Sequence, residues 1–532
     1  MGKNYFGVML DCSRNAVMKP TEVVNFAKIV KSFGYNMIQL YTEDTYEVID
    51  EPFFGYMRGR YTQDELCYIV NECEKMGVEV IPCIQTLAHL NQIFRWPPYR
   101  EARDTADILL AGEERTYELV ENIFKTLRKC FKTEYVNIGM DEAEMIGRGK
   151  YFEKHGARER LEILKEHLEK VCALAKKYGF KPMMWSDMFF KLATDGKTYY
   201  HENPNVTEEV KNAVPSEMEL IFWDYYHEDK AMYDGMISGH QKFNNPMWFA
   251  GGAWTWSGFA PGNEFTLKSM LPAMQSAKEH GVKNIFMTMW GDNGKECSFY
   301  SILPTLFTIK KAYDGEMDIE KIKAEFTALT GEDYDAMMAC DLPNFVSGNR
   351  VCYKNVCKYA LYADPFNSFM ECKCKDGVND EYVKHTETLR AYAKASKQYA
   401  YLFESLAALC DVLTVKYALG KRTRQAYQAK DAQALEKVIK EYITVEEKVE
   451  VFYKKFRALW YKENKPTGFD MQDIRIGALK QRLRSCRERL EEYWKGEIEN
   501  IPELEEEILD CFPNLEIPEM NSWDWIVSAN VM

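Results

Sequence analysis

Two adjacent carboxylates follow a short apolar segment of the chain. Residues 135–144 read YVNIGMDEAE, so Asp141 and Glu142 come directly after a β-branched, apolar stretch. Burying one unpaired carboxylate is unfavourable, and a second one beside it is worse because like charges repel. One carboxyl group of such a pair can give a proton while the other stabilises charge elsewhere on a substrate. Neighbouring residues of an extended strand point in opposite directions, so the pair predicts two different roles unless the chain turns there.

Eight short apolar segments divide the first part of the chain. Each is rich in β-branched or aromatic residues and too short for a helix, and continuous apolarity is typical of a strand buried on both faces. The segments are residues 5–11, 37–44, 78–86, 135–142, 182–187, 219–226, 247–256 and 284–292. Amphipathic stretches of helical spacing separate them, so strands and helices are expected to alternate.

Helix boundary signals support this alternation. Thr21 is a suitable N-cap for a helix over residues 21–34, and Thr62 and Glu65 have capping-box spacing at the start of the next helix. Several of the helices end at a glycine, which adopts the left-handed conformation of a C′ residue without a steric penalty. The glycines in question are Gly34, Gly77, Gly179 and Gly281.

Eight consecutive strand–helix units predict an α/β fold, a (β/α)8 TIM barrel. A doubly wound open sheet is the alternative, although eight units are many for it. No GxGxxG follows the first strand and no Walker motif occurs, so nucleotide binding has little support. Long amphipathic helical segments replace the strand-like ones after residue 317. We therefore expect a catalytic barrel over residues 1–317 and an all-α C-terminal domain over residues 318–532, whose helices either pack on the barrel or form a homodimer interface.

Polar and aromatic residues gather just after the eight apolar segments, where the catalytic groups of a barrel lie. They include Arg14, Glu43, Asp44, His89, Asp141, Glu142, Trp185, Trp223, Tyr225, Trp254, Trp256, Trp290, Asp292 and Glu296, with Asp11, Asp187, Asp224 and Tyr226 at similar positions. Each alone has an ordinary explanation, such as an N-cap Asp or a core Trp. Together they predict a sugar pocket, because aromatic faces stack on apolar sugar faces while carboxylates and Arg bind hydroxyl groups.

Metal binding is the competing use of so many acids. A divalent cation needs several converging carboxylates or histidines, and His89 is the one histidine among the selected strand-end residues. The density of tryptophan suits a sugar better. We therefore expect no metal and no cofactor.

The adjacency of Asp141 and Glu142 bears on the kind of sugar chemistry. In an ordinary retaining glycosidase two carboxylates flank the scissile bond at roughly 5 Å, and in an inverting one they stand farther apart. Neighbours that point in different directions do not fit that arrangement. A substrate that carries its own nucleophile would complete the set, which is the substrate-assisted exception.

The segments IGMDE, YTEDTYEVIDEPFFGYMRGRYT and TMWGDNGKECS, at the fourth, second and eighth strands, resemble glycoside hydrolase family 20, the β-N-acetylhexosaminidases. The likeness is to a bacterial subgroup with a helical C-terminal domain and covers about residues 5–310. It implies a retaining, exo-acting enzyme that releases terminal GlcNAc or GalNAc from oligosaccharides or glycoconjugates with a terminal β-linked N-acetylhexosamine. The 2-acetamido oxygen of the substrate would attack the anomeric carbon and form an oxazolinium intermediate.

The resemblance also implies roles for the acids and the histidine. Glu142 would be the general acid and then the general base, and Asp141 would orient the acetamide N–H and stabilise the charged intermediate. His89 would support the general acid together with Glu43 or Asp44. A charged Asp141 and apolar walls both raise the pKa of Glu142, as a general acid at neutral pH requires.

The remaining candidates are assigned by the same resemblance. Arg14 would hold sugar hydroxyls, and Asp292, with Glu296 as its nearby rival, would bind the outer hydroxyls. The aromatic residues that would wall the ring and acetamide are Trp185, Trp223 and Trp290. The family usually places a tyrosine on the seventh strand to bind the acetamide oxygen, where this chain has Trp254 and Trp256, and Tyr225 on the sixth strand is the best substitute.

Two alternatives stay open at this point. One is a related glycosidase specific for GalNAc or a modified GlcNAc. The other is a catalytically silent sugar-binding barrel, against which the intact pair Asp141 and Glu142 speaks.

Composition limits the partners and the compartment. The net charge of −14 and the pI near 5.3 argue against nucleic-acid and anionic-membrane partners. No apolar run approaches the ~20 residues that span a bilayer. Fifteen scattered cysteines are typical of free thiols in a reducing compartment, and the N-terminus has no secretory h-region, so we expect a cytoplasmic protein.

Overall fold

The computed structural model describes residues 4–193, 199–292, 294–350 and 354–519, which form two compact units. We call them the barrel unit and the helical unit. The barrel unit consists of Met1–Ala253, Thr266–Trp290 and Leu306–Asp318. The helical unit consists of Trp254–Phe265, Gly291–Thr305 and Ile319–Met532. Two stretches that follow barrel strands therefore belong to the helical unit.

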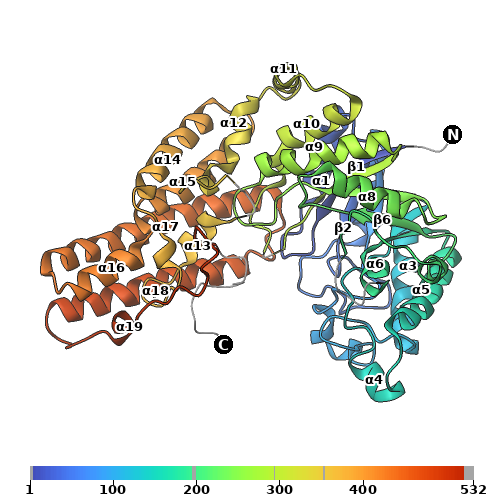
Figure 1. The fold of residues 1–532 in the computed structure, drawn as a ribbon, viewed down its shortest axis with the longest axis horizontal. Coiled ribbons are helices and arrows are strands. Elements are labelled where there is room, and N and C mark those ends of the chain that lie inside the picture. The colour runs from blue at the N-terminus through green and yellow to red at the C-terminus, as the bar shows by residue number, and fades with distance from the viewer. Residues whose placement is uncertain (1–3, 194–198, 293, 351–353, 520–532) are drawn as a thin grey trace. The chain divides into compact units, whose positions relative to one another are not determined.

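Eight parallel strands close into a barrel in the order in which they occur in the chain (Figure 1). They are β1 (Tyr5–Asp11), β2 (Met37–Tyr41), β3 (Glu79–Cys83), β4 (Tyr135–Asn137), β5 (Lys181–Trp185), β6 (Glu219–Trp223), β7 (Met247–Gly252) and β8 (Asn284–Met289). Strand β1 pairs with β8 from Tyr5 opposite Asn284 to Leu10 opposite Met289, and this closes the ring. The predicted barrel is confirmed, and the open doubly wound sheet is excluded.

Helices of the barrel unit alternate with these strands. They are α1 (Pro20–Ser32), α2 (Gln63–Lys75), α3 (Glu114–Cys130), α4 (Lys150–His155), α5 (Arg160–Lys177), α6 (Asp187–Ala193), α7 (Glu208–Ala213) and α8 (Lys230–His240), with α9 (Asn263–Glu279) and α10 (Leu303–Asp314) crossing the boundary between the units. The predicted capping box of α2 is confirmed, because Thr62 accepts the Glu65 N–H while Glu65 accepts the Thr62 N–H.

The predicted N-cap at Thr21 is wrong. Helix α1 begins at Pro20, and Lys19 occupies the N-cap without a side-chain hydrogen bond. Proline suits the first helical position because its φ is already helical and that position has no use for an N–H donor. The predicted glycine caps are confirmed, since Gly34, Gly77, Gly179 and Gly281 all have positive φ, between 69° and 99°.

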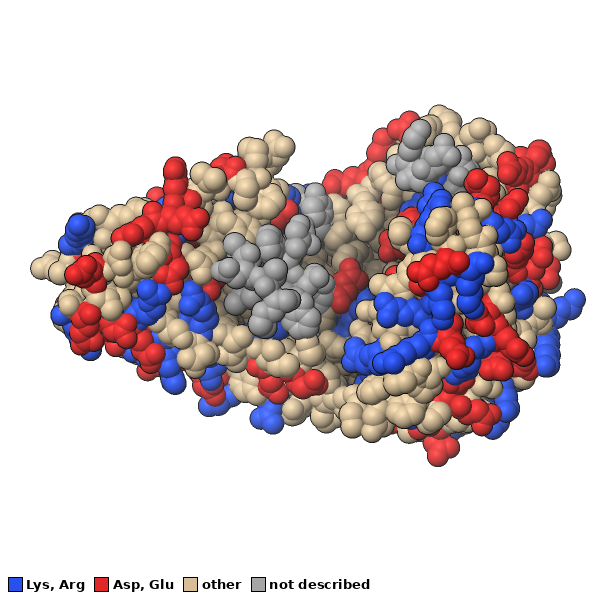
Figure 2. All heavy atoms as spheres, turned by 90° about the horizontal axis from the view of Figure 1, so that it is seen from below, with Lys and Arg blue, Asp and Glu red and all other residues tan. Residues whose placement is uncertain are grey.

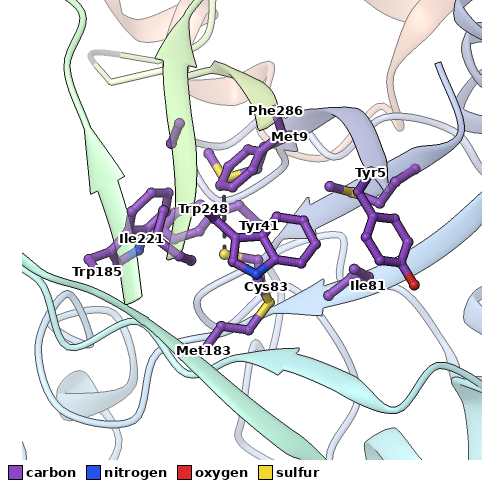
Figure 3. Packing of buried hydrophobic residues seen from close by; sticks show 12 residues of the cluster. Tyr5, Met9, Tyr41, Ile81, Cys83, Met183, Trp185, Ile221, Trp248 and Phe286 are labelled. Atoms are coloured by element: carbon purple, nitrogen blue, oxygen red, sulfur yellow. Dashed lines mark hydrogen bonds between the residues drawn. The ribbon is translucent and has the colours of Figure 1, made fainter. Parts of the chain in front are cut away.

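The barrel interior is filled by apolar side chains from most of its strands (Figure 3). Twelve buried residues form this core cluster: Tyr5, Met9, Met37, Tyr41, Ile81, Cys83, Met183, Trp185, Ile221, Trp248, Ala250 and Phe286. Tyr135, Trp223 and Trp290 are partly buried and pack against it. The interior is thus a packed core, and a ligand has room only at an end of the barrel.

The helical unit contains no strand among its described residues, in agreement with the predicted all-α domain. Its helices are α11 (Ile319–Thr330), α12 (Tyr334–Met338), α13 (Val356–Tyr362), α14 (Val378–Ala395), α15 (Ala400–Lys416), α16 (Leu419–Gln428), α17 (Ala432–Glu463), α18 (Asp470–Trp494) and α19 (Pro502–Glu505). Helix α15 packs between α14 and α17, and α17 also contacts α16 and α18 (Figure 1). Across the described part of the chain, no helix combines the length and the apolarity needed to cross a membrane.

Charges of both signs are interspersed on the face of the molecule seen in Figure 2. Many exposed Lys and Arg side chains there and elsewhere lie within ion-pair distance of Asp or Glu, as Lys177 does with Glu121. Such exposed pairs contribute little to stability.

Candidate active site

The chain turns sharply at the carboxyl end of β4. Regular pairing of this strand ends at Asn137, and Gly139, Met140 and Glu142 then have φ of 75°, 69° and 53°. Left-handed backbone is unfavourable for residues with a Cβ, so Met140 and Glu142 must be held by their surroundings. The chain therefore turns where Asp141 and Glu142 lie, so these two neighbouring acids can point toward the same place.

Asp141 and Glu142 converge on one imidazole ring. The Nε2 atom of His89 lies 3.3 Å from Oδ2 of Asp141 and 3.7 Å from Oε2 of Glu142. Three residues from the ends of two neighbouring strands thus meet in one ionic cluster. The opposite orientation expected of neighbours in a straight strand does not apply, because the backbone has left the strand before Asp141.

Two side chains from neighbouring strands hold the turn. The Met140 N–H donates to Oε1 of Gln85 at 3.1 Å, and Nε2 of Gln85 donates to Oδ1 of Asp141 at 2.8 Å. The Glu142 N–H donates to Oδ2 of Asp187 at 3.1 Å. Gln85 follows β3 and Asp187 follows β5, so both flanks of β4 contribute.

The charge of His89 keeps Asp141 ionised. Burial alone would raise the pKa of the Asp141 carboxyl, but the His89 charge and the hydrogen bond from Gln85 lower it below its usual value. Burial lowers the pKa of His89, and the charge of Asp141 outweighs this and raises the pKa to about 10. The two groups form an ion pair across the pH range in which most enzymes work.

The pKa of Glu142 is shifted in the opposite direction to that of Asp141. Partial burial and the negative charge of Asp141 raise the pKa of Glu142, and the charges of His89 and Lys191 only partly offset this. Its side chain is nevertheless 53% exposed, so a ligand can reach it. The neighbours therefore differ in protonation: Asp141 favours the charged form, and Glu142 retains its proton to a higher pH than an ordinary glutamate.

A chain of polar contacts links this cluster to the ends of β1 and β2. Tyr41 donates to Oε1 of Glu43 at 2.9 Å and accepts from Nε2 of Gln85 at 3.1 Å. Arg14 lies 3.1 Å from the same oxygen of Glu43, and the Arg14 side chain is 31% exposed. Burial raises the pKa of Glu43, although the Arg14 charge opposes the rise.

Asp44 lies outside that chain of contacts. It is buried and receives the Arg58 guanidinium at 3.2 Å, and Arg58 also donates to the backbone oxygen of Ser13. Of the two second-strand acids predicted to support the general acid through His89, Glu43 is the one whose charge acts on His89. Asp44 fastens the loop after β2 to the loop after β1.

The aromatic candidates of the barrel unit lie together. The Trp290 ring is 4.8 Å from Tyr41 and 5.9 Å from Trp185, and Trp223 stacks on Tyr225 at 5.2 Å. Trp223 and Trp290 are half-buried, so part of each indole can face a ligand. Trp185 is 1% exposed and belongs to the core cluster, where it supports Trp290.

The other four candidates belong to the helical unit. Trp254 stacks on Trp256 at 4.3 Å, and Asp292 is exposed. Glu296 is buried, with its two oxygens 2.9 Å from Nζ of Lys358 and 2.7 Å from NH1 of Arg475. Both oxygens of Glu296 are thus engaged by buried cations, whereas Asp292 is on the surface.

Sequence reasoning missed the polar residues that position the pair. Gln85 and Tyr41 were not selected, and Asp187 was noted only as a residue at a strand end. The available signal was a polar side chain within an otherwise buried segment, as Gln85 is in VEVIPCIQT. Among the described residues, no three His, Cys, Asp or Glu side chains are grouped so that they could hold a metal ion.

A closed parallel barrel whose rim carries two neighbouring carboxyls with oppositely shifted pKa values beside half-buried tryptophans has the architecture of a barrel glycoside hydrolase. The model of the glycosyl hydrolase family 20 catalytic domain matches residues 40–247, and that of the glycoside hydrolase 20C C-terminal domain matches residues 332–521. The chain belongs to glycoside hydrolase family 20.

Similar proteins include two curated hexosaminidases. The chain is 22% identical to beta-hexosaminidase 3 of Arabidopsis thaliana, over 46% of this chain and 48% of that protein. It is also 22% identical to hexosaminidase D of Bos taurus, over 37% of this chain and 56% of that protein. The chain thus spans about half the length of the curated relatives that it matches.

Solved structures of the family are also similar. A GH20 exo beta-N-acetylglucosaminidase from Vibrio harveyi has a TM-score of 0.47 and 15% identity, over 62% of this chain and 58% of that one. A chitobiase from Flavobacterium johnsoniae has a TM-score of 0.45 and 17% identity, over 94% of this chain and 74% of that one.

The turn at the end of β4 leads to a prediction about Gly139. A Cβ there would lie 2.2 Å from Oε1 of Gln85 and 2.7 Å from the backbone oxygen of Ile84, whereas a Cβ at Gly179 would meet nothing within 4 Å. Both glycines have left-handed φ, so Gly179→Ala should lower the free energy of unfolding by about 1–2 kcal/mol. Gly139→Ala should cost about 1–3 kcal/mol more because of overpacking. Urea unfolding of the two variants measures the difference, and equal losses would contradict a closely packed turn.

Proposed function

We propose that the protein is a retaining, exo-acting β-N-acetylhexosaminidase that releases terminal GlcNAc or GalNAc through an oxazolinium intermediate. The observation that supports this most directly is the difference between Asp141 and Glu142. They share one histidine, yet the pKa of the buried Asp141 is lowered while the pKa of the accessible Glu142 is raised. A pair whose pKa values are shifted in opposite directions suits a substrate that brings its own nucleophile.

The first step would break the glycosidic bond. Glu142 gives its proton to the glycosidic oxygen, and the 2-acetamido oxygen attacks the anomeric carbon as the aglycone leaves. The resulting oxazolinium ion carries a positive charge, which the Asp141 carboxylate stabilises while it accepts the hydrogen bond of the acetamide N–H. Since His89 is positively charged and lies beside both carboxyls, it keeps Asp141 charged.

The second step would open the oxazolinium. Glu142, now a carboxylate, removes a proton from a water molecule, and the water oxygen forms a new bond to the anomeric carbon. The acetamide is restored, Glu142 regains its proton, and the sugar leaves with its original anomeric configuration. Two inversions at one carbon thus account for retention.

Residues around the acid pair would hold the sugar. Arg14 is partly exposed and lies 3.1 Å from Glu43, and we assign this guanidinium to hydroxyl groups of the sugar. Trp223 and Trp290 offer half-buried indole faces for stacking on the pyranose ring, and Tyr225 stacks on Trp223. We assign Tyr225 to the acetamide oxygen. The roles of Asp292, Trp254 and Trp256, which belong to the helical unit, stay predictions of the sequence.

The same contacts bear on the alternatives. A silent sugar-binding barrel has no use for a glutamate whose pKa is raised beside an ionised aspartate, so the geometry favours a catalyst. Preference for GalNAc or for a modified GlcNAc depends on contacts to the 4-hydroxyl and the outer substituents, and Arg14 is our candidate for the hydroxyl contact in the barrel unit.

We further propose a cytoplasmic location. Every cysteine among the described residues is in the thiol form, with no disulfide between any two of them. This supports a reducing compartment. Self-association through the helical unit remains a prediction.

Replacing Glu142 tests the assignment of the general acid. Glu142→Gln keeps the size of the side chain but removes its proton, so kcat/KM for an aryl β-N-acetylglucosaminide should fall by about 10²–10⁴. Glu134→Gln is the matched control, because Glu134 is an exposed acid at the other end of β4 that forms an ion pair with the exposed Lys181 at 3.0 Å. Its turnover should be that of the unmodified protein. Equal turnover in Glu142→Gln and the unmodified protein would exclude the assignment.

The pH dependence follows from the same two carboxyls. The pKa of Glu142 is raised, so activity that needs its proton is lost as the pH rises through that pKa. The pKa of Asp141 is lowered, so activity that needs its charge is lost as the pH falls through that pKa. His89, with a pKa of about 10, should not titrate between these limits. A kcat/KM profile that stayed at a plateau into alkaline solution would contradict this account.

A further inference from the structure

Asp187 is a buried acid in direct contact with the backbone of Glu142. It is the first residue of α6, and its side chain is inaccessible to solvent. Its Oδ2 atom accepts the Glu142 N–H at 3.1 Å, and its Oδ1 atom accepts a long hydrogen bond of 3.5 Å from the Trp223 indole. The Asp187 carboxyl thus links the backbone of Glu142, a proposed catalytic residue, to the indole of Trp223, a proposed wall of the sugar pocket.

The backbone at Glu142 needs such a contact. Glutamate disfavours the left-handed region, and Glu142 has a φ of 53°. Its side chain is also half exposed, so packing alone does not fix it. A hydrogen bond from a backbone N–H to a carboxylate is stronger than one between neutral groups, and it can hold the residue in this conformation. Without it Glu142 is free to return to a common conformation, which moves its carboxyl away from His89.

The charges around Asp187 determine how strongly this buried carboxyl holds its proton. Four acids (Asp141, Glu142, Glu144 and Asp187) face two cations, His89 and Lys191. Nζ of Lys191 lies 2.5 Å from Glu144 and 3.5 Å from Asp187. Two negative charges are therefore in excess, and like charges in a buried site favour retention of protons. Burial and the charge of Asp141 raise the pKa of Asp187 to about 7, while the nearby Lys191 opposes the rise.

We propose that Asp187 is a positioning residue for Glu142, which it holds in the left-handed turn by accepting the Glu142 N–H and aligns with the pocket wall through Trp223. The proposal rests on the proposed function only in naming Glu142 as the general acid. The contact itself is independent of the substrate.

Two substrates with different leaving groups can distinguish a misplaced general acid from a general loss of structure. A dinitrophenyl β-N-acetylglucosaminide needs no proton to lose its aglycone, whereas a simple phenyl glycoside does. Asp187→Ala should lower kcat/KM for the phenyl substrate by about 10²-fold, the size expected of a group displaced by about 1 Å. It should leave kcat/KM for the dinitrophenyl substrate within a few-fold of the unmodified protein, because kcat/KM reports the first step and not the second, in which Glu142 is the general base. Asp187→Asn keeps one acceptor oxygen and should recover part of the lost rate.

A matched control comes from the helical unit. Asp341 is also buried, and its two oxygens accept the backbone N–H groups of Asn263 and Glu264, each at 2.9 Å. Burial raises its pKa to about 8. Asp341→Asn should therefore perturb stability much as Asp187→Asn does. The ratio of the two aryl rates should stay unchanged in Asp341→Asn.

A second measurement does not depend on activity. Hydrogen–deuterium exchange of the Glu142 amide should be slow in the unmodified protein and at least about tenfold faster in Asp187→Ala, because that amide loses its acceptor. Fast exchange in the unmodified protein, or an equal loss of kcat/KM for both aryl substrates in Asp187→Ala, would overturn the proposal. If the unmodified protein cleaved neither substrate, the proposed function would fail, and the exchange rates would still decide whether Asp187 holds Glu142.

Discussion

The ion pair between Asp141 and His89 is the interaction on which the candidate site depends. The two groups are 3.3 Å apart, and the positive charge of His89 stabilises the buried negative charge of Asp141. Without His89, burial would favour the protonated, neutral form of Asp141. A charged Asp141 then raises the pKa of its neighbour Glu142. The ion pair thus shifts the pKa values of two neighbouring carboxyls in opposite directions, and this difference is what the proposed substrate-assisted mechanism requires of them.

A second constraint comes from the helical unit. The stretches after β7 and β8 carry Trp254, Trp256 and Asp292, and residues of distant helices hold them. Asn355 donates to the backbone oxygen of Ser257 at 2.8 Å, and Lys358 and Arg475 fix Glu296. A buried ion group of this kind adds little net stability but is costly to break, so it restricts the loop to one arrangement.

Local signals predicted the fold well because they depend on neighbouring residues alone. Periodic apolar segments predicted all eight strands, and glycines such as Gly179 marked helix ends. The turn at Met140 and Glu142 could not be predicted, since left-handed backbone opposes the preference of both residues and is imposed by Gln85 and Asp187 from other strands. The burial of Glu296 could not be predicted for a similar reason. Its partners, Lys358 and Arg475, follow it by 62 and 179 residues.

A crystal structure with a bound thiazoline that mimics the oxazolinium would show whether Asp141 and Glu142 have these two separate roles. A carboxylate oxygen of Asp141 should lie about 2.7–3.0 Å from the thiazoline nitrogen. Glu142 should lie on the side of the anomeric carbon from which the aglycone departs. A complex in which Asp141 and Glu142 instead flank the anomeric carbon on opposite faces, with neither near the thiazoline nitrogen, would contradict these roles.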